Sequence, residues 1–511
     1  MARRAAALAA AILLAAPATA AELILHPTIQ TASGAVTGEL SGDVQVYRGI
    51  PYAAPPVGAL RWRPPQPPAP WTGRRDATTF GFDCVQTLFP GDSTPSIHTQ
   101  SEDCLTLNIW RHTAPTAGPV PVMVWIHGGG YTNGIGTSPM FDGAALARAG
   151  VIVVTLNYRL GRFGFFAHPA LTADRPDEPK GNYGFMDQIA ALKWVQANIA
   201  AFGGDPAKVT VFGESAGGAS VNLLLASPMA RGLFARAITE SGGLGDSWPC
   251  LADAEAKGLA FAKARGVEGA DAAALRALPL EVVKGDLSMG QGRPETYSGP
   301  MVDGKVVPRP PLEVFLKGEG AKVPFLLGAN SLEAGASNPV AAAAIVGRLP
   351  TAAQAAVRAA YDPGGGHAQL DLNFPSEAIF VASTRWLAGQ HAKAGQPTYL
   401  YRFDVVPAGR RATAQGARHA SEMPYVFGTL PTAGTTTDAA DAKASETVRA
   451  YWTNFAKTGD PNGPGLPPWP RYDAGDQALT IGVGGPKAGP HPNPKRLDLL
   501  MSQPRSVCPA V

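Results

Sequence analysis

The chain contains several short, continuously apolar runs without the strict alternation of a half-exposed strand. Runs of this kind are typical of strands that are buried on both faces, as in a parallel sheet. They lie at residues 121–126, 151–156, 209–212, 324–327 and 398–403. Helical patterns follow at residues 186–200 and 219–226. This alternation predicts an α/β fold with a large, central, mostly parallel twisted sheet and helices on both faces.

Two further segments have a clear local character. Residues 51–70 contain so many prolines that neither a helix nor a central strand is expected, which predicts a loop along the surface. Residues 341–360 are rich in alanine and predict a helix that Pro350 interrupts. The loop at 51–70 is not expected to be a linker between domains. Length alone would suggest two to four domains, but α/β folds often form one long unit, so we expect one domain over residues 22–511.

Composition places the chain among ordinary globular proteins. It has 511 residues, of which 45% are hydrophobic and 16% charged, and this length is ample for a large core. The formal net charge is only +3 and lysine and arginine form no run, so we expect no nucleic-acid partner. No histidine pair has metal-ligand spacing, so we expect no metal.

The first residues have the features of a secretory signal peptide. Arg3 and Arg4 precede an apolar stretch from Ala5 to Ala16, and small residues complete the segment 1–21. An uncleaved membrane anchor is the alternative, but the apolar stretch is shorter than the roughly 20 residues of a membrane span. We therefore expect a secreted or periplasmic protein without a membrane span, beginning near Glu22.

Export affects the interpretation of the four cysteines, Cys84, Cys104, Cys250 and Cys508. Disulfide bonds are the default in an oxidising compartment, and four cysteines allow three pairings. The sequence has no C-x-x-C, so neither a zinc site nor a thioredoxin-like site is indicated.

A serine lies between the predicted strand at residues 209–212 and a predicted helix. The sequence Gly213-Glu214-Ser215-Ala216-Gly217 has the G-x-S-x-G pattern in the strand–turn–helix setting of a nucleophilic serine. The N-terminus of the helix would favour negative charge at the reacting atoms. The alternative is a glycine-rich packing turn with a solvated serine.

A glycine run after another predicted strand favours the catalytic interpretation. Residues 127–130 read His-Gly-Gly-Gly and directly follow the apolar run at 121–126. The backbone N–H groups of Gly129 and Gly130, with that of Ala216, can bind an oxyanion. The alternative is a flexible loop.

Several longer motifs, in the same order, resemble those of the type-B carboxylesterase family, which includes cholinesterases and bacterial para-nitrobenzyl esterases. They are RGIPYA (48–53), SEDCL (101–105), WIHGGG (125–130), NYRLG (157–161), GESAGGAS (213–220) and GDPN (459–462). The resemblance covers nearly the whole mature chain. It implies an α/β-hydrolase fold and a serine ester hydrolase that acts on a small-molecule ester without a cofactor.

The resemblance also implies the acid of a catalytic triad. Residues 328–335, GANSLEAG, resemble the family segment that ends in the triad glutamate, which implies Glu333. The family has Asp before this Glu and Gly after it, where this chain has Leu332 and Ala334. A solvated surface charge is the alternative.

Nine histidines compete for the role of the base. Residues 417–427, ARHASEMPYVF, resemble the catalytic-histidine loop of the family and imply His419. His127 is a rival by its chemistry, but its place beside the glycine run favours a scaffold or pocket role. We expect His168, His367 and His391 to be surface or core residues.

The family mechanism then implies a role for each residue. Ser215 attacks the ester carbonyl, His419 transfers the proton, and Glu333 orients the imidazole while an acyl-enzyme forms and is hydrolysed. Glu214 corresponds to a family glutamate that lines the site. Ser241 corresponds to a serine behind the triad acid, although a plain turn residue is the alternative.

The resemblance implies a disulfide bond between Cys84 and Cys104, which closes a loop at the rim of the site. It supports a bond between Cys250 and Cys508 less directly, and two free thiols are the alternative. The Cys84–Cys104 loop contains no tryptophan, whereas the choline-recognising tryptophan of cholinesterases lies in this loop. A cholinesterase is therefore disfavoured.

Other functions remain alternatives at this point. They are a lipase-like enzyme, a specialist esterase for a natural product or xenobiotic, and a non-catalytic binding module of the same fold. We expect the variable segments 280–300 and 363–395 to form the acyl pocket, but the sequence does not identify which side chains point inward. No sequence pattern indicates an oligomeric state, and we take a monomer as the expectation.

Overall fold

The computed structural model describes residues 26–244, 248–269, 271–289 and 294–502 together with Cys508. The expected signal peptide, residues 1–21, lies outside the described residues. Within these ranges, no helix combines the length and the apolar character needed to cross a membrane.

An 11-stranded sheet forms the centre of the molecule, in the order β18-β17-β16-β15-β14-β13-β9-β10-β8-β4-β3. The strands from β17 to β10 run parallel, and antiparallel strands flank them on both sides. The parallel strands are β9 (Val120–Ile126), β10 (Ile152–Leu156), β13 (Gly204–Glu214), β14 (Arg236–Glu240), β15 (Phe325–Asn330), β16 (Thr398–Asp404) and β17 (Gln477–Gly482). The flanking strands are β3 (Glu39–Ser41), β4 (Val44–Pro51), β8 (Thr106–His112) and β18 (Gly485–Pro490).

Each of the five predicted apolar runs lies in a strand of this sheet, and both faces of the strands are buried. In β9, Val122 and Val124 pack into the core on one face, while Met123 and Trp125 pack into the core on the other. The expected α/β-hydrolase architecture, with a mostly parallel sheet between helices, is therefore confirmed.

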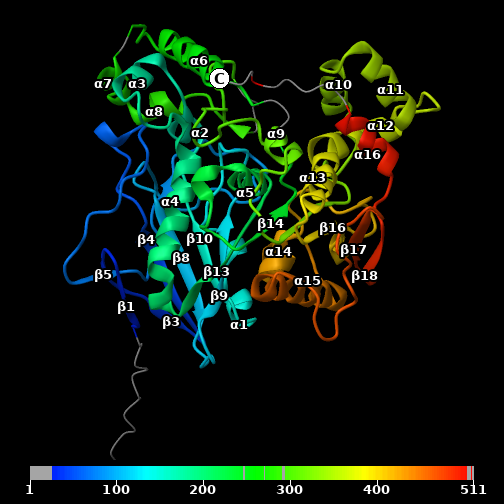
Figure 1. Ribbon diagram of the computed structural model, residues 1–511, viewed down its shortest axis with the longest axis horizontal. Helices are drawn as coiled ribbons and strands as arrows, with labels where there is room; N and C mark the ends of the chain where they lie inside the picture. Colours follow the sequence, from blue (N-terminus) through cyan, green and yellow to red (C-terminus); the bar gives the residue numbers. More distant parts are fainter. Residues whose placement is uncertain (1–25, 245–247, 270, 290–293, 503–507, 509–511) are drawn as a thin grey trace, which may run out of the picture.

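Helices cover both faces of the sheet and extend beyond it (Figure 1). They are α1 (Ala144–Arg148), α2 (Gly161–Gly164), α3 (Pro169–Asp174), α4 (Tyr183–Asn198), α5 (Ala216–Ala226), α6 (Leu251–Ala264), α7 (Ala272–Arg276), α8 (Leu280–Lys284), α9 (Pro311–Leu316), α10 (Pro339–Gly347), α11 (Thr351–Tyr361), α12 (Ala368–Ser376), α13 (Ala382–Lys393), α14 (Met423–Phe427), α15 (Ala439–Thr458) and α16 (Pro494–Met501). A π-helix, η6 (Glu377–Val381), joins α12 to α13.

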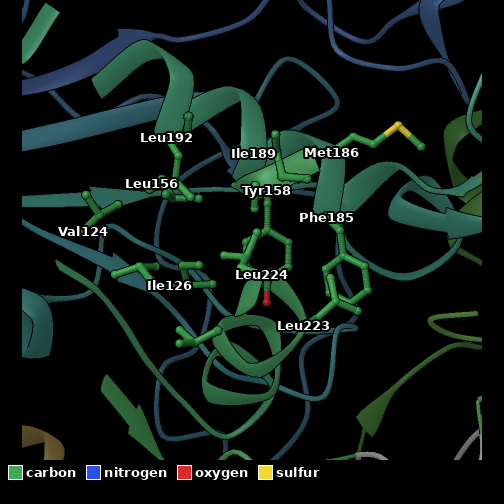
Figure 2. Close-up of a cluster of buried hydrophobic side chains, with 14 of the residues drawn as sticks. Val124, Ile126, Leu156, Tyr158, Phe185, Met186, Ile189, Leu192, Leu223 and Leu224 are labelled. Atoms are coloured by element: carbon green, nitrogen blue, oxygen red, sulfur yellow. The ribbon is translucent and has the colours of Figure 1, made fainter. Parts of the chain in front are cut away.

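One face of the sheet packs against α4 and α5 (Figure 2). Val124 and Ile126 of β9 contribute to a cluster with Phe185 and Ile189 of α4 and Leu224 of α5. These side chains have at most 2% of their surface exposed. The cluster packs α5 against β9; the serine directly precedes this helix, and the glycine run follows this strand.

The alanine-rich segment forms two helices, as predicted from Pro350. Helix α10 ends at Gly347 and α11 begins at Thr351, with Pro350 as its N-cap residue. Figure 1 shows α10, α11, α12 and α16 gathered at one end of the molecule. Their apolar side chains form a separate core that includes Val346, Val357 and Leu497.

Smaller sheets of two or three strands lie outside the main sheet. They are β1 (Thr28–Thr31) and β2 (Gly34–Thr37) with β5 (Arg74–Asp76), β6 (Asp83–Cys84) with β7 (Gln100–Ser101), and β11 (Phe165–Phe166) with β12 (Gly181–Asn182). The pair of β6 and β7 lies within the loop that the cysteines Cys84 and Cys104 close by a disulfide bond. A second disulfide joins Cys250 to Cys508, so the alternative of two free thiols is wrong.

Candidate active site

Ser215 lies at a sharp turn between the last residue of β13 and the first residue of α5. Its backbone has φ 55° and ψ −122°, a left-handed conformation that is uncommon for a residue with a side chain. The Ser215 N–H donates a hydrogen bond to the carbonyl oxygen of Glu240, at the end of the neighbouring strand, over 2.9 Å. The turn therefore holds a strained serine above the edge of the sheet.

The glycines of the pattern permit the close approach of this turn to β9. A Cβ atom on Gly217 would lie 2.0 Å from the carbonyl oxygen of Ile126, and one on Gly213 would lie 2.6 Å from the carbonyl oxygen of the same residue. Only glycine fits at such distances, since real Cβ atoms essentially never approach another heavy atom within 3.0 Å. The G-x-S-x-G pattern thus has a packing reason at both of its glycines.

The three candidate triad residues come together at the carboxyl ends of parallel strands. Nε2 of His419 lies 2.9 Å from Oγ of Ser215, and Nδ1 of His419 lies 2.6 Å from Oε2 of Glu333. The loops that carry the last two residues are joined directly, because the His419 N–H donates to the carbonyl oxygen of Glu333 over 3.1 Å. Leu332 and Ala334, which differ from the family pattern, flank Glu333 without displacing it from the histidine.

The second oxygen of Glu333 also has defined partners. Oε1 accepts hydrogen bonds from Oγ of Ser241 and from the backbone N–H of Asn330, each over 2.7 Å. Ser241 is fully buried and has a left-handed backbone with φ 49°. The structure therefore places Ser241 behind the candidate acid.

The glycine run lies directly against the serine. A Cβ atom on Gly128 would lie 3.0 Å from Cβ of Ser215, and Gly129 and Gly130 have left-handed backbones with φ 97° and 62°. Ala216, the first residue of α5, completes the expected set of N–H donors. The run is a backbone surface without side chains beside the serine hydroxyl, as binding of an oxyanion requires.

His127 supports this run rather than competing for the role of the base. Its ring is buried and stacks on that of Tyr158, with centroids 4.5 Å apart, and Nδ1 lies 2.9 Å from the carbonyl oxygen of Gly128. Burial lowers the pKa of His127 to about 4, so the ring is neutral. His168, His367 and His391 have partners outside this site, on Ala170, Asp362 and Val323.

Buried carboxyl groups surround the candidate base. Oε1 of Glu214 lies 3.2 Å from Nε2 of His419, and burial raises the pKa of Glu214 to about 7. Burial also raises the pKa of Glu240 to about 8, and that of Glu422 well above its ordinary value. Burial disfavours a charge on His419, but the carboxylates of Glu214 and Glu333 outweigh this effect and raise its pKa. The site thus favours an imidazolium.

Sequence reasoning missed some residues at this site. Phe380, in the π-helix η6, stacks on His419 with ring centroids 4.5 Å apart. Oε1 of Glu240 accepts a hydrogen bond from Nε1 of Trp452 over 2.8 Å.

The sequence predicts that the segments 280–300 and 363–395 form the acyl pocket. A Cβ atom on Gly130 would lie 3.1 Å from Sδ of Met289, and Phe380 stacks on His419, so described residues of both segments lie at the site.

The described residues contain no group of three or more His, Cys, Asp and Glu side chains that could hold a metal ion. The residues gathered at the site are instead a hydroxyl, an imidazole, carboxyl groups and backbone N–H donors. These groups can perform nucleophilic substitution at a carbonyl carbon with proton transfer.

Comparisons with known proteins agree with this chemistry. Residues 25–354 and 369–498 match the profile of the Carboxylesterase family. The chain is 38% identical to a fumonisin B1 esterase of Sphingopyxis macrogoltabida, over 93% of this chain and 89% of that protein. It is 35% identical to a liver carboxylesterase of Sus scrofa, over 89% of each chain. A PNB esterase structure superposes with a TM-score of 0.82 at 33% identity, covering 93% of this chain and 99% of that one. The chain therefore belongs to the carboxylesterase family and is an ester hydrolase.

Proposed function

We propose that the protein is an exported serine carboxylesterase in which Ser215, His419 and Glu333 form the catalytic triad. The observation that carries this proposal is the continuous chain of hydrogen bonds from Oγ of Ser215 through both ring nitrogens of His419 to Glu333, with distances of 2.9 and 2.6 Å. Each group has the reach and the orientation of its role.

In the proposed mechanism, Oγ of Ser215 attacks the carbonyl carbon of the ester, and His419 accepts the hydroxyl proton. The carboxylate of Glu333 stabilises the imidazolium and fixes its tautomer through Nδ1. The N–H groups of Gly129, Gly130 and Ala216 bind the oxyanion of the tetrahedral intermediate. His419 then donates the proton to the departing alcohol, and water hydrolyses the acyl-enzyme by the same steps.

The alternative of a non-catalytic binding module has less support. A binding module does not need a nucleophile, a base and an acid in hydrogen-bond contact, nor a side-chain-free backbone surface beside the nucleophile. It also does not need the strained backbone of Ser215, which costs about 1–3 kcal/mol.

The experiment is hydrolysis of p-nitrophenyl esters with acyl chains of increasing length, by the parent protein and by Ser215→Ala. A matched control is Ser421→Ala, because Ser421 lies in the histidine loop but its hydroxyl donates to the carbonyl oxygen of Arg418. We expect activity in the parent and the control and its loss in Ser215→Ala, with an unchanged circular dichroism spectrum. Near-parental turnover by Ser215→Ala would overturn the triad.

The same assay addresses the substrate. The acyl-chain optimum measures the depth of the acyl pocket, and a rise in rate above the solubility limit of the ester would favour the lipase-like alternative. One relative is named a fumonisin B1 esterase, so fumonisin B1 serves as the probe for the specialist alternative.

A separate experiment tests export. The protein is isolated from outside the cytoplasm and its N-terminal sequence is determined, and we expect this sequence to begin near Glu22.

A further inference from the structure

We propose that Gln86 is a positioning residue for the oxyanion-binding glycine run, which it fixes to the disulfide-closed loop between Cys84 and Cys104. The inference rests on the proposed function, because it assumes that the N–H groups of Gly129 and Gly130 receive the oxyanion. Gln86 is not part of the triad, and its side chain does not need to contact the substrate.

The carboxamide of Gln86 binds the backbone of Gly134 from both sides. Nε2 donates to the carbonyl oxygen of Gly134 over 3.0 Å, and Oε1 accepts from the Gly134 N–H over 2.9 Å. Nε2 also donates to the carbonyl oxygen of Cys84 over 3.1 Å. Gln86 has only 4% of its surface exposed, so these hydrogen bonds are shielded from water.

The peptide that Gln86 holds is the one on which Gly129 packs. A Cβ atom on Gly129 would lie 2.2 Å from the carbonyl oxygen of Asn133, and the carbonyl oxygen of Gly129 accepts hydrogen bonds from the N–H groups of Thr132 and Asn133 over 3.1 and 2.9 Å. Gly129 therefore packs directly on the Asn133–Gly134 peptide. A shift of this peptide would move the glycine run with it.

A second side chain joins the same two loops. Nδ2 of Asn133, which is fully buried, donates to the carbonyl oxygen of Thr87 over 2.7 Å. On the opposite side, Tyr158 donates from its hydroxyl to the carbonyl oxygen of His127 over 3.0 Å. The glycine run thus lies between the stacked rings of His127 and Tyr158 and the loop that the Cys84–Cys104 disulfide closes. Gln86 supplies most of the hydrogen bonds between that loop and the segment after the glycine run.

This arrangement predicts a specific kinetic effect. Oxyanion donors stabilise the negative charge that develops in the transition state, and this stabilisation depends on the position of the donors relative to that charge. Loss of the Gln86 carboxamide should therefore lower kcat and leave KM nearly unchanged. It should also weaken binding of a trifluoromethyl ketone. Oγ of Ser215 would add to the carbonyl carbon of this inhibitor, and the resulting oxyanion would lie where the oxyanion of the tetrahedral intermediate lies.

The test compares Gln86→Met, which keeps the length of the side chain without its polar atoms, with the control Gln100→Met. Gln100 lies in the same loop and accepts a hydrogen bond from the backbone N–H of Gln86, but not from Gly134. We expect Gln86→Met to lower kcat by about 10- to 100-fold, with KM changed by less than about threefold and the inhibition constant of the ketone raised by the factor lost in kcat/KM.

A kcat of Gln86→Met within about twofold of the parent, or an equal loss in Gln100→Met, would overturn the inference. Should Gln86→Met not fold, Gln86→Leu replaces it, because this variant also lacks both the acceptor for the Gly134 N–H and the Nε2 donors. An unchanged kcat in that variant would have the same meaning. Ser215→Ala distinguishes the two proposals, since activity in that variant contradicts the triad itself, whatever the Gln86 variants do.

Discussion

The hydroxyl of Ser241 donates to Oε1 of Glu333 over 2.7 Å, and the other oxygen of the same carboxylate contacts Nδ1 of His419. Ser241 therefore acts on the candidate base through the acid. We predict that Ser241→Ala lowers kcat by roughly 10- to 150-fold with little change in KM, because one hydrogen bond to a charged group contributes roughly 1.5–3 kcal/mol. Steady-state kinetics on a p-nitrophenyl ester measures this effect.

The left-handed backbone of Ser241 calls for a second variant. Ser241→Gly removes the same hydroxyl but relieves the strain of its φ of 49°. Both variants should lose kcat to a similar extent, and Ser241→Gly should unfold at a higher temperature than Ser241→Ala, because alanine keeps the backbone strain that glycine relieves. A loss of kcat in neither variant would mean that the backbone N–H of Asn330 alone suffices to hold Glu333.

Oε1 of Glu214 lies 3.2 Å from Nε2 of His419, and its negative charge raises the pKa of that imidazole. As the proposed base, His419 must be neutral to accept the proton of Ser215. Nearby carboxylates raise its pKa, so we predict that the acidic limb of the rate profile lies above the ordinary histidine value of 6.5. Glu214→Gln removes one of these negative charges. We predict that the limb moves to lower pH by roughly one unit, measured as kcat/KM between pH 4 and 9. A shift to higher pH would contradict the electrostatic role of Glu214.

Glu240 makes stability depend on pH. Burial raises its pKa from 4.5 to about 8, so the folded protein binds a proton that the unfolded chain releases near pH 4.5. The associated stability is complete below pH 4.5 and is lost as the pH rises through about 8. We predict that Glu240→Gln unfolds at a higher temperature than the parent at pH 8 and at the same temperature at pH 4.5. The same difference in unfolding temperature between the variant and the parent at both pH values would refute this prediction.

The close packing of Gly217 predicts a large cost for one added methyl group. A Cβ atom there would lie 2.0 Å from the carbonyl oxygen of Ile126, whereas one on Gly347, at the end of α10, would have no atom within 4 Å. We expect Gly217→Ala to destabilise by more than about 2 kcal/mol and to abolish activity. Gly347→Ala should be neutral or stabilise by up to about 1 kcal/mol. Urea unfolding of both variants tests the contrast, and equal midpoints would disprove it.

Strands buried on both faces were readable in the sequence because they are continuously apolar, as in β9 and β10. Strand β14, with the sequence RAITE, was not predicted, because it is short and ends in a threonine and a glutamate that are buried only in the folded protein. Strand β18 was missed for a similar reason, since Pro486 and Pro490 lie within it at the edge of the sheet.

The candidate triad could be located because local motifs surround each of its residues. The contacts of Glu240 with Trp452 and of Gln86 with Gly134 could not, because they join residues 212 and 48 positions apart and no local pattern marks either partner. The stacking of Phe380 on His419 depends on a π-helix, whose register is not apparent from the sequence.

The disulfide between Cys250 and Cys508 turns the chain between these residues into a covalent ring that contains Glu333 and His419 but not Ser215. A protease that cuts this ring once, for example in the exposed turn at residues 363–366, therefore cannot release a fragment. The nicked protein would keep its full mass on a non-reducing gel and would separate into two pieces only after reduction. The two parts of the cut ring thus remain covalently joined after one cleavage.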